Sequence, residues 1–131
     1  MPNIEDVRIL VIEDEEFIRK IIFQILSKLR VSKISEAVDG GEGFRKTMLM
    51  KPDLIFCDIH MEPVNGIQFL TKLRSFNKPE IANTPVVFLT SDAQESNVMK
   101  AKKLKVSGYM VKPVSVNDFK KQITRILKID L

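Results

Sequence analysis

The chain has 131 residues, of which 44% are hydrophobic, and a formal net charge of +4 at pH 7. This length predicts one domain whose core forms without covalent cross-links, and the single cysteine excludes an internal disulfide framework. The sequence contains no run of about 18 apolar residues, so no membrane span is predicted. The N-terminus is acidic and lacks the basic-then-apolar pattern of a signal peptide. We therefore expect a cytoplasmic protein, whose scattered positive charge permits an acidic partner without requiring one.

The first half of the chain predicts two strand-and-helix units before a third strand. An almost wholly apolar run over residues 7–12 predicts the first strand, and four acids at 13–16 lead into helical periodicity over 17–29. A weaker strand over 32–38 ends in an Asp-Gly-Gly turn signal, and a short helix over 43–49 follows it. Polar or turn-forming residues end each element, as expected between strands and helices.

The third strand, over residues 53–58, ends in Asp58 and has an apolar middle. A strand that is apolar on both faces favours a parallel sheet covered by helices on both sides. In open α/β sheets, ligands bind beyond the carboxyl ends of the strands. The residues after Asp58 are polar and turn-rich as far as Gly66, so a carboxylate is predicted at the edge of the sheet where ligands bind.

The second half of the chain predicts, in order, a helix over 66–73, a polar loop over 75–84, a strand over 86–89, a fourth helix, a strand over 107–111 and a fifth helix. Two of these helices start with a capping pair, Asp92 with Glu95 and Ser115 with Asp118. Strict alternation of strands and helices predicts an α/β fold of three layers, a doubly wound five-stranded parallel sheet between helices. We expect one domain over residues 1–131, with no second domain attached.

Polar side chains stand at the predicted strand ends, namely Glu13 and Asp14, Asp58, Thr90, and Lys112. The carboxyl ends of a doubly wound sheet converge on one edge, so these groups are expected to share one cleft. Carboxylates this close repel one another and favour a shared hard cation such as Mg²⁺. Each residue alone has a structural explanation, but their joint placement predicts a phosphoryl-transfer site with a carboxylate nucleophile.

In this order and spacing, the segments 10–14, 53–58, 89–91 and 108–113 resemble the receiver domain of response regulators. The resemblance is strongest to stand-alone receivers of the chemotaxis type, and it covers the chain from about Val7 to about Leu127. It implies a flavodoxin-like strand order of 2-1-3-4-5 and a two-component response regulator without an output domain. It also implies a phosphoacceptor rather than an enzyme that turns over other substrates.

The resemblance assigns roles to the acidic residues. Asp58 would accept a phosphoryl group from the phosphohistidine of a sensor histidine kinase or a phosphotransfer protein. Asp14, Asp58 and the backbone carbonyl of His60 would bind Mg²⁺, with Mn²⁺ as the alternative ion. Glu13 would act on the metal mainly through water. The protein would therefore be a metal-binding phosphoprotein.

The same resemblance assigns a switch to the later strands. Lys112 would pair with Asp58 and then with the phosphate, and the peptide bond between Lys112 and Pro113 would be cis. Thr90 would move to bond a phosphate oxygen, and Tyr109 would rotate inward behind it. The fourth helix, fifth strand and fifth helix would then bind a downstream protein of unknown identity. We expect a monomer or weak dimer without direct DNA or membrane binding.

Several positions depart from the usual receiver pattern. Glu62 stands where relatives usually have proline, and Ser91 where alanine or glycine is common. His60 and Asp92 occupy the two positions that modulate phosphate loss in this family. We hypothesise that they meet over the pocket and hinder the attacking water, in which case His60→Ala would shorten the phosphate lifetime and an unchanged lifetime would exclude the idea.

Three other functions are alternatives to a phosphorylated switch. A flavodoxin-like cofactor binder needs a hydroxyl- and glycine-rich loop after the first strand, whereas the acids at 13–16 would repel a phosphate without a metal. A hydrolase of the haloacid type carries a second aspartate two residues after the nucleophile, where this chain has His60. A degenerate receiver that acts only as a scaffold would have no need of the acids, Thr90 and Lys112.

Overall fold

Five parallel strands form one sheet in the order β2-β1-β3-β4-β5. The computed structural model describes residues 3–91 and 100–131. The strands are β1 (Arg8–Ile12), β2 (Lys33–Ala37), β3 (Leu54–Asp58), β4 (Val86–Thr90) and β5 (Gly108–Val111). The predicted doubly wound α/β fold and its strand order are confirmed.

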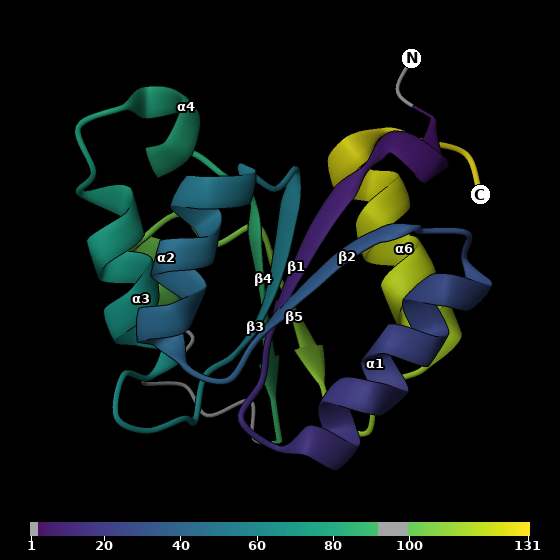
Figure 1. Cartoon of the computed structure of the whole chain (residues 1–131), viewed down its shortest axis with the longest axis horizontal. Coiled ribbons are helices and arrows are strands. Elements are labelled where there is room, and N and C mark those ends of the chain that lie inside the picture. Colours follow the sequence, from purple (N-terminus) through teal and green to yellow (C-terminus); the bar gives the residue numbers. More distant parts are fainter. Residues whose placement is uncertain (1–2, 92–99) are drawn as a thin grey trace.

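Helices cover both faces of the sheet and make the three predicted layers. They are α1 (Glu16–Lys28), α2 (Gly40–Met50), α3 (Gly66–Arg74), α4 (Pro79–Ala82) and α6 (Val116–Leu127), with a short 3-10 helix η1 (Ile4–Asp6) before β1 and helical residues at 100–103. Figure 1 shows α2, α3 and α4 on one face of the sheet and α1 and α6 on the other. No helix in the described ranges is long and apolar enough to cross a membrane.

The central strands are buried on both faces, as the apolar run before Asp58 predicts. Every residue of β3 and β4 is buried. On the α1 and α6 face, the ring of Phe56 packs edge-on against Phe119 with centroids 4.7 Å apart. On the α2 and α3 face, Phe69 and Leu70 are fully buried against the sheet. This packing holds the end of β3, and therefore Asp58, in a fixed place.

One predicted helix boundary was wrong and one short helix was missed, for different reasons. α2 begins at Gly40 rather than at residue 43, because Asp39 caps it by accepting the N–H of Glu42 at 2.9 Å. A Cβ on Gly43 would lie 2.4 Å from the side chain of Ile12, so close packing on β1 requires glycine at this position, although glycine lowers helix propensity. The predicted loop over 75–84 contains α4, whose first residue is Pro79, since proline suits that position.

Capping boxes stand at the starts of α6 and α3, whereas α1 begins without a side-chain cap. Ser115 and Asp118 form the predicted capping box of α6. Asn65 and Gln68 form a second capping box at α3, which has the same spacing but was not predicted. The predicted pair at Asp92 lies outside the described residues.

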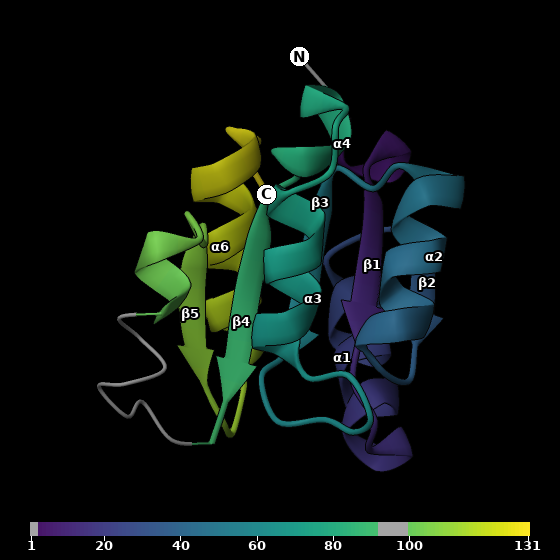
Figure 2. The same ribbon diagram turned by 90° about the vertical axis from the view of Figure 1, so that its left-hand side faces the viewer.

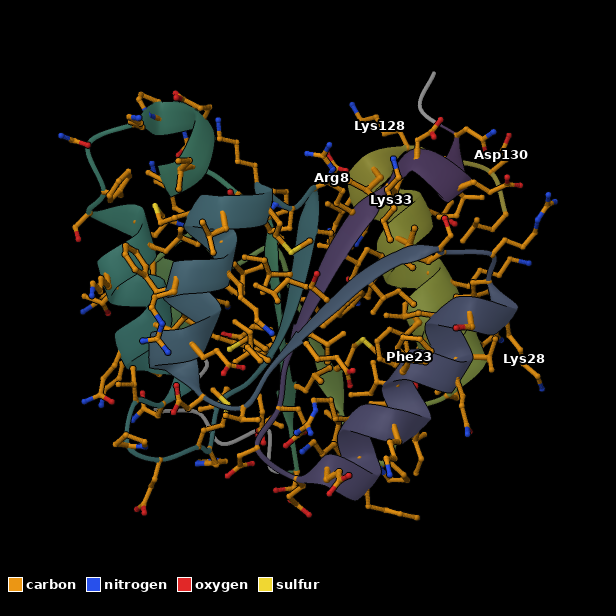
Figure 3. The ribbon with its side chains drawn as sticks, in the orientation of Figure 1. Arg8, Phe23, Lys28, Lys33, Lys128 and Asp130 are labelled. Carbon is orange, nitrogen blue, oxygen red and sulfur yellow. The ribbon has the colours of Figure 1, made fainter. Side chains whose placement is uncertain are left out.

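Basic side chains gather at the end of the sheet opposite to Asp58. Figure 3 shows Arg8, Lys33 and Lys128 at the end of the molecule where both termini lie. Arg8 and Lys33 are register partners at the starts of β1 and β2, and Lys128 caps the carboxyl end of α6. Lys128 lies at the negative end of the α6 dipole, which stabilises a cation. Lys33 Nζ lies 4.0 Å from Asp6 Oδ1, and Arg8 Nη1 donates to the carbonyl of Met50 at 3.3 Å, so these side chains need no ligand to explain them.

Candidate functional site at the carboxyl ends of the strands

The strand order brings the predicted site residues to one edge of the sheet. Asp58 and Thr90 are the last residues of β3 and β4, while Glu13 and Lys112 directly follow β1 and β5. Ile12 pairs with Cys57 in the register, which sets Glu13 beside Asp58. Figure 2 shows the arrowheads of β1, β4 and β5 pointing toward this same edge.

Three carboxylates form an acidic cluster there. Carboxylate oxygens of Glu13, Asp14 and Asp58 all lie within 4.8 Å of one another. Glu13 is fully buried and Asp58 is 3% exposed, whereas Asp14 faces solvent. Mg²⁺ prefers oxygen ligands, typically one or two carboxylates with waters, so this donor set fits the predicted ion and leaves it an open side.

Lys112 supplies the positive charge inside the acidic cluster. Its Nζ donates to Glu13 Oε1 at 2.8 Å and to Asp58 Oδ2 at 3.3 Å. Burial lowers the pKa of Lys112, but the hydrogen bond to Glu13 and the charge of Asp58 outweigh it, so the net shift is upward. The ammonium therefore stays charged. The peptide bond between Lys112 and Pro113 is cis, as predicted.

Glu13 is the carboxyl group that burial perturbs most clearly. Its pKa is raised from 4.5 to about 7, first by burial and also by the negative charge of Asp58, while the hydrogen bond from Lys112 lowers it. The backbone of Glu13 is fixed by Arg19, whose Nη1 donates to its carbonyl at 2.8 Å. A cation bound to the acidic cluster would favour the ionised form of Glu13.

The stability of the metal-free protein is expected to fall between pH 4.5 and about 7 on account of Glu13. A carboxyl group with a raised folded-state pKa contributes stability that is present below its unfolded pKa and lost as pH rises through its folded pKa. We expect a loss of about 1–2 kcal/mol, after allowance for solvent screening.

Urea unfolding of wild type, Glu13→Gln and Glu15→Gln with a chelator, on both sides of this pH range, measures the loss. In Glu13→Gln, the free energy of unfolding should differ less between the two pH values, because glutamine does not ionise. Glu15→Gln, an exposed neighbour, should keep it. Equal pH dependence in all three proteins would contradict the assignment.

Asp58 is held in one orientation by its surroundings. Its Oδ1 accepts the backbone N–H of His60 at 3.2 Å, while Oδ2 faces Lys112. A Cβ built on Gly66 would lie 2.6 Å from the carbonyl oxygen of Asp58, so α3 begins directly against the backbone of Asp58. The sequence placed Gly66 at a helix start but did not predict this close approach.

Thr90 and Tyr109 lie near the cluster on neighbouring strands. Thr90 is 1% exposed, and its carbonyl accepts the backbone N–H of Lys112 at 2.8 Å. The half-buried ring of Tyr109 lies 6.3 Å from the ring of Phe88, and burial raises the pKa of its hydroxyl. The two predicted switch residues therefore lie on adjacent strands of the sheet, Thr90 on β4 and Tyr109 on β5.

The departures from the receiver pattern line the exposed side of the site. His60, Glu62 and Ser91 are exposed, and the bond between Glu62 and Pro63 is a second cis peptide, which was not predicted. Asp92 lies outside the described residues, so its meeting with His60 stays a prediction. Glu62 adds no carboxylate to the cluster of three that the structure records.

Known proteins resemble this chain in sequence. The response regulator receiver domain family matches residues 9–124. The chemotaxis protein CheY of Treponema pallidum (strain Nichols) is 36% identical over 129 residues, which cover 97% of this chain and 87% of that protein. The transcriptional regulatory protein PdtaR of Mycobacterium tuberculosis is 34% identical over 111 residues, which cover 85% of this chain but only 52% of that protein.

Solved structures agree on the fold. The chemotaxis protein CheY4 of Vibrio cholerae matches with a TM-score of 0.84 at 23% identity, over 92% of this chain and 98% of that one. At this identity, the similarity supports the architecture alone. The family is shown by the sequence matches.

Proposed function

The chain belongs to the response regulator receiver family of two-component signalling systems, and from this premise we propose that Asp58 is its phosphoacceptor. The donor is the phosphohistidine of a sensor histidine kinase or a phosphotransfer protein. One observation carries the proposal: the carboxylate of Asp58 stands at a strand end within a three-carboxylate cluster and is held by Lys112 and the N–H of His60.

The transfer needs a nucleophile and neutralised charge. An oxygen of Asp58 attacks phosphorus, an O–P bond forms, the N–P bond to imidazole breaks, and the imidazole leaves with its electron pair and takes up a proton. Glu13, Asp14, Asp58 and the carbonyl of His60 are the groups that would hold Mg²⁺, or Mn²⁺ as the alternative. When bound, the ion offsets the charge of carboxylate and phosphate oxygens.

Lys112 has a separate task in this proposal. It shares its ammonium between Glu13 at 2.8 Å and Asp58 at 3.3 Å, and the second contact is the longer. A phosphoryl group on Asp58 brings new acceptor oxygens, so we propose that Lys112 exchanges its Asp58 contact for one of them while it keeps Glu13.

The phosphoryl group then shifts the equilibrium between two arrangements of Thr90 and Tyr109. Thr90 bonds a phosphate oxygen and Tyr109 turns inward, which changes the face made by the helix at 100–103, β5 and α6. A downstream protein reads that face. The protein acts as a phosphoacceptor that assists its own phosphorylation and dephosphorylation, and it contacts proteins rather than DNA or membranes as a monomer or weak dimer.

Reaction with a small acyl phosphate tests the proposed function. With Mg²⁺, we expect intact-mass spectrometry to find one phosphoryl group on the wild-type protein, and with a chelator we expect about a hundredfold slower uptake, since uncompensated carboxylates repel the donor. No adduct with Mg²⁺ would refute the function. The decay of the same adduct in His60→Ala tests the proposed role of that residue in phosphate lifetime, and an unchanged decay would exclude that role.

A further inference from the structure

A single guanidinium group binds four backbone carbonyls at the end of the sheet opposite to Asp58. Arg74 is the last residue of α3. Its Nε donates to the carbonyl of Leu104 at 2.9 Å, and its Nη2 to that of Lys105 at 3.1 Å. Its Nη1 donates to the carbonyls of Ala82 at 2.7 Å and Thr84 at 2.8 Å. One side chain therefore joins the end of α3 to residues 82–84 and to residues 104–105.

The charge of Arg74 is balanced by carbonyl dipoles rather than by a carboxylate. No ion pair of Arg74 is recorded within residues 3–91 and 100–131, whereas the exposed Arg30 pairs with Glu5 at 2.6 Å. The guanidinium is half-buried, and burial lowers its pKa. A partly desolvated cation with fixed planar donors holds its acceptors in a defined geometry, which a flexible surface pair does not.

Arg74 supplies the capping that two helix ends need. Ala82 is the last residue of α4, and helix carbonyls in the last turn have no partner within their own helix. The helical residues at 100–103 end in a reversal in which Val106 N–H donates to Ala101 at 3.1 Å and Lys105 adopts a φ of 56°. The guanidinium binds the carbonyls of Leu104 and Lys105 within this reversal.

The clamped segments lead directly into the two strands of the proposed switch. Ala82 and Thr84 precede β4, which ends at Thr90 beside the acidic cluster. The reversal at Lys105 precedes β5, which carries Tyr109. α3 itself starts at Gly66 against the backbone of Asp58. The clamp thus fixes the far ends of the elements whose near ends surround the phosphoacceptor.

We infer that Arg74 is a positioning residue of the switch, which anchors the starts of β4 and β5 and the end of the helix at 100–103 to α3. This inference rests on the proposed function. A displacement of Thr90 is passed to β5 and the helix because their opposite ends are fixed on a common anchor. Without Arg74, the displacement is absorbed by movement of the loosened reversal.

Hydrogen exchange of the unphosphorylated protein tests the anchor itself. In Arg74→Met, we expect the amides of Leu104, Lys105 and Val106 to exchange about tenfold faster than in wild type, with no matching change in α6. Arg74→Lys keeps the charge but loses the planar fork, so intermediate exchange is expected. Arg45→Met, at an exposed arginine of α2, is the matched control and should leave these amides unchanged. Unchanged protection in Arg74→Met would overturn the inference.

Emission from Tyr109 tests the role in the switch, because the chain has one tyrosine and no tryptophan. We expect all variants to take up one phosphoryl group as wild type does. The phosphorylation-dependent change in Tyr109 emission should fall to about half or less in Arg74→Met, with partial rescue in Arg74→Lys. Equal emission changes with equal adduct refute the switch role alone. A wild-type protein that takes up no phosphoryl group refutes the proposed function and the switch role together, while hydrogen exchange still reports the anchor.

Discussion

Asp58→Asn is expected to abolish phosphoryl uptake from an acyl phosphate in the presence of Mg²⁺. An amide is a poor nucleophile and a poor metal ligand, so uptake should fall by about a thousandfold or more, the scale of losing a nucleophile. The fold should survive, because Lys112 keeps Glu13 as a partner at 2.8 Å and the repulsion between Asp58 and Glu13 is removed. Intact mass measures uptake, and circular dichroism checks the fold.

The matched control is Asp53→Asn, the same substitution at the residue directly before the same strand. Asp53 is exposed, and its Oδ2 accepts the backbone N–H of Arg8 at 2.8 Å. We expect normal phosphoryl uptake and a loss of about 1 kcal/mol in the free energy of unfolding. An adduct on Asp58→Asn, or its loss from Asp53→Asn alone, would show that another residue accepts the phosphoryl group.

Gly66→Ala is expected to destabilise the protein and to slow phosphoryl uptake together. The added Cβ would lie 2.6 Å from the carbonyl oxygen of Asp58 and 2.9 Å from Cα of Ile59. These are backbone atoms, so relief requires a shift of α3 or of the end of β3. Overpacking of this kind costs about 1–3 kcal/mol, and a shift near 1 Å at a reacting group slows transfer by about a hundredfold.

Gly41→Ala is the matched glycine control, at the second residue of α2. There, the nearest atom to an added Cβ is Oδ1 of Asp39 at 3.3 Å, the oxygen that caps α2, so a shift of a few tenths of an ångström relieves the contact. Alanine favours helix over glycine, so the free energy of unfolding should stay the same or rise by up to about 1 kcal/mol. Urea unfolding gives both stabilities, and equal values for Gly66→Ala and wild type would show that the two backbones separate without cost.

The fold followed from local patterns with few errors. Apolar runs, turn signals and caps predicted five strands in their order along the chain, because the period of a strand or helix is written into neighbouring residues. Periodicity did not separate buried from exposed apolar residues at helix starts, since Phe17 belongs to the predicted stripe of α1 but is 74% exposed. α4 was missed because a single turn carries too little pattern.

The meeting of Glu13, Asp58 and Lys112 could also be expected, since the carboxyl ends of parallel strands share one edge. The sequence could not predict which oxygen Lys112 contacts, or how far the pKa of Glu13 is raised. Both depend on side-chain positions and on the exclusion of solvent. The four carbonyls around Arg74 gave no signal in the sequence, because every residue offers a carbonyl and only its placement makes it a ligand.

Residue order alone determined the alternation of strands and helices and the polar groups at the strand ends, because periodicity and side-chain chemistry are local properties. Tertiary structure decided how those groups pair, how closely Gly66 approaches Asp58, and that Arg74 clamps three segments. Lys112 and Glu13 are 99 residues apart in the chain, and only the packed sheet sets the 2.8 Å between them. Distances between such residues are fixed by the whole core, and no window of sequence contains them.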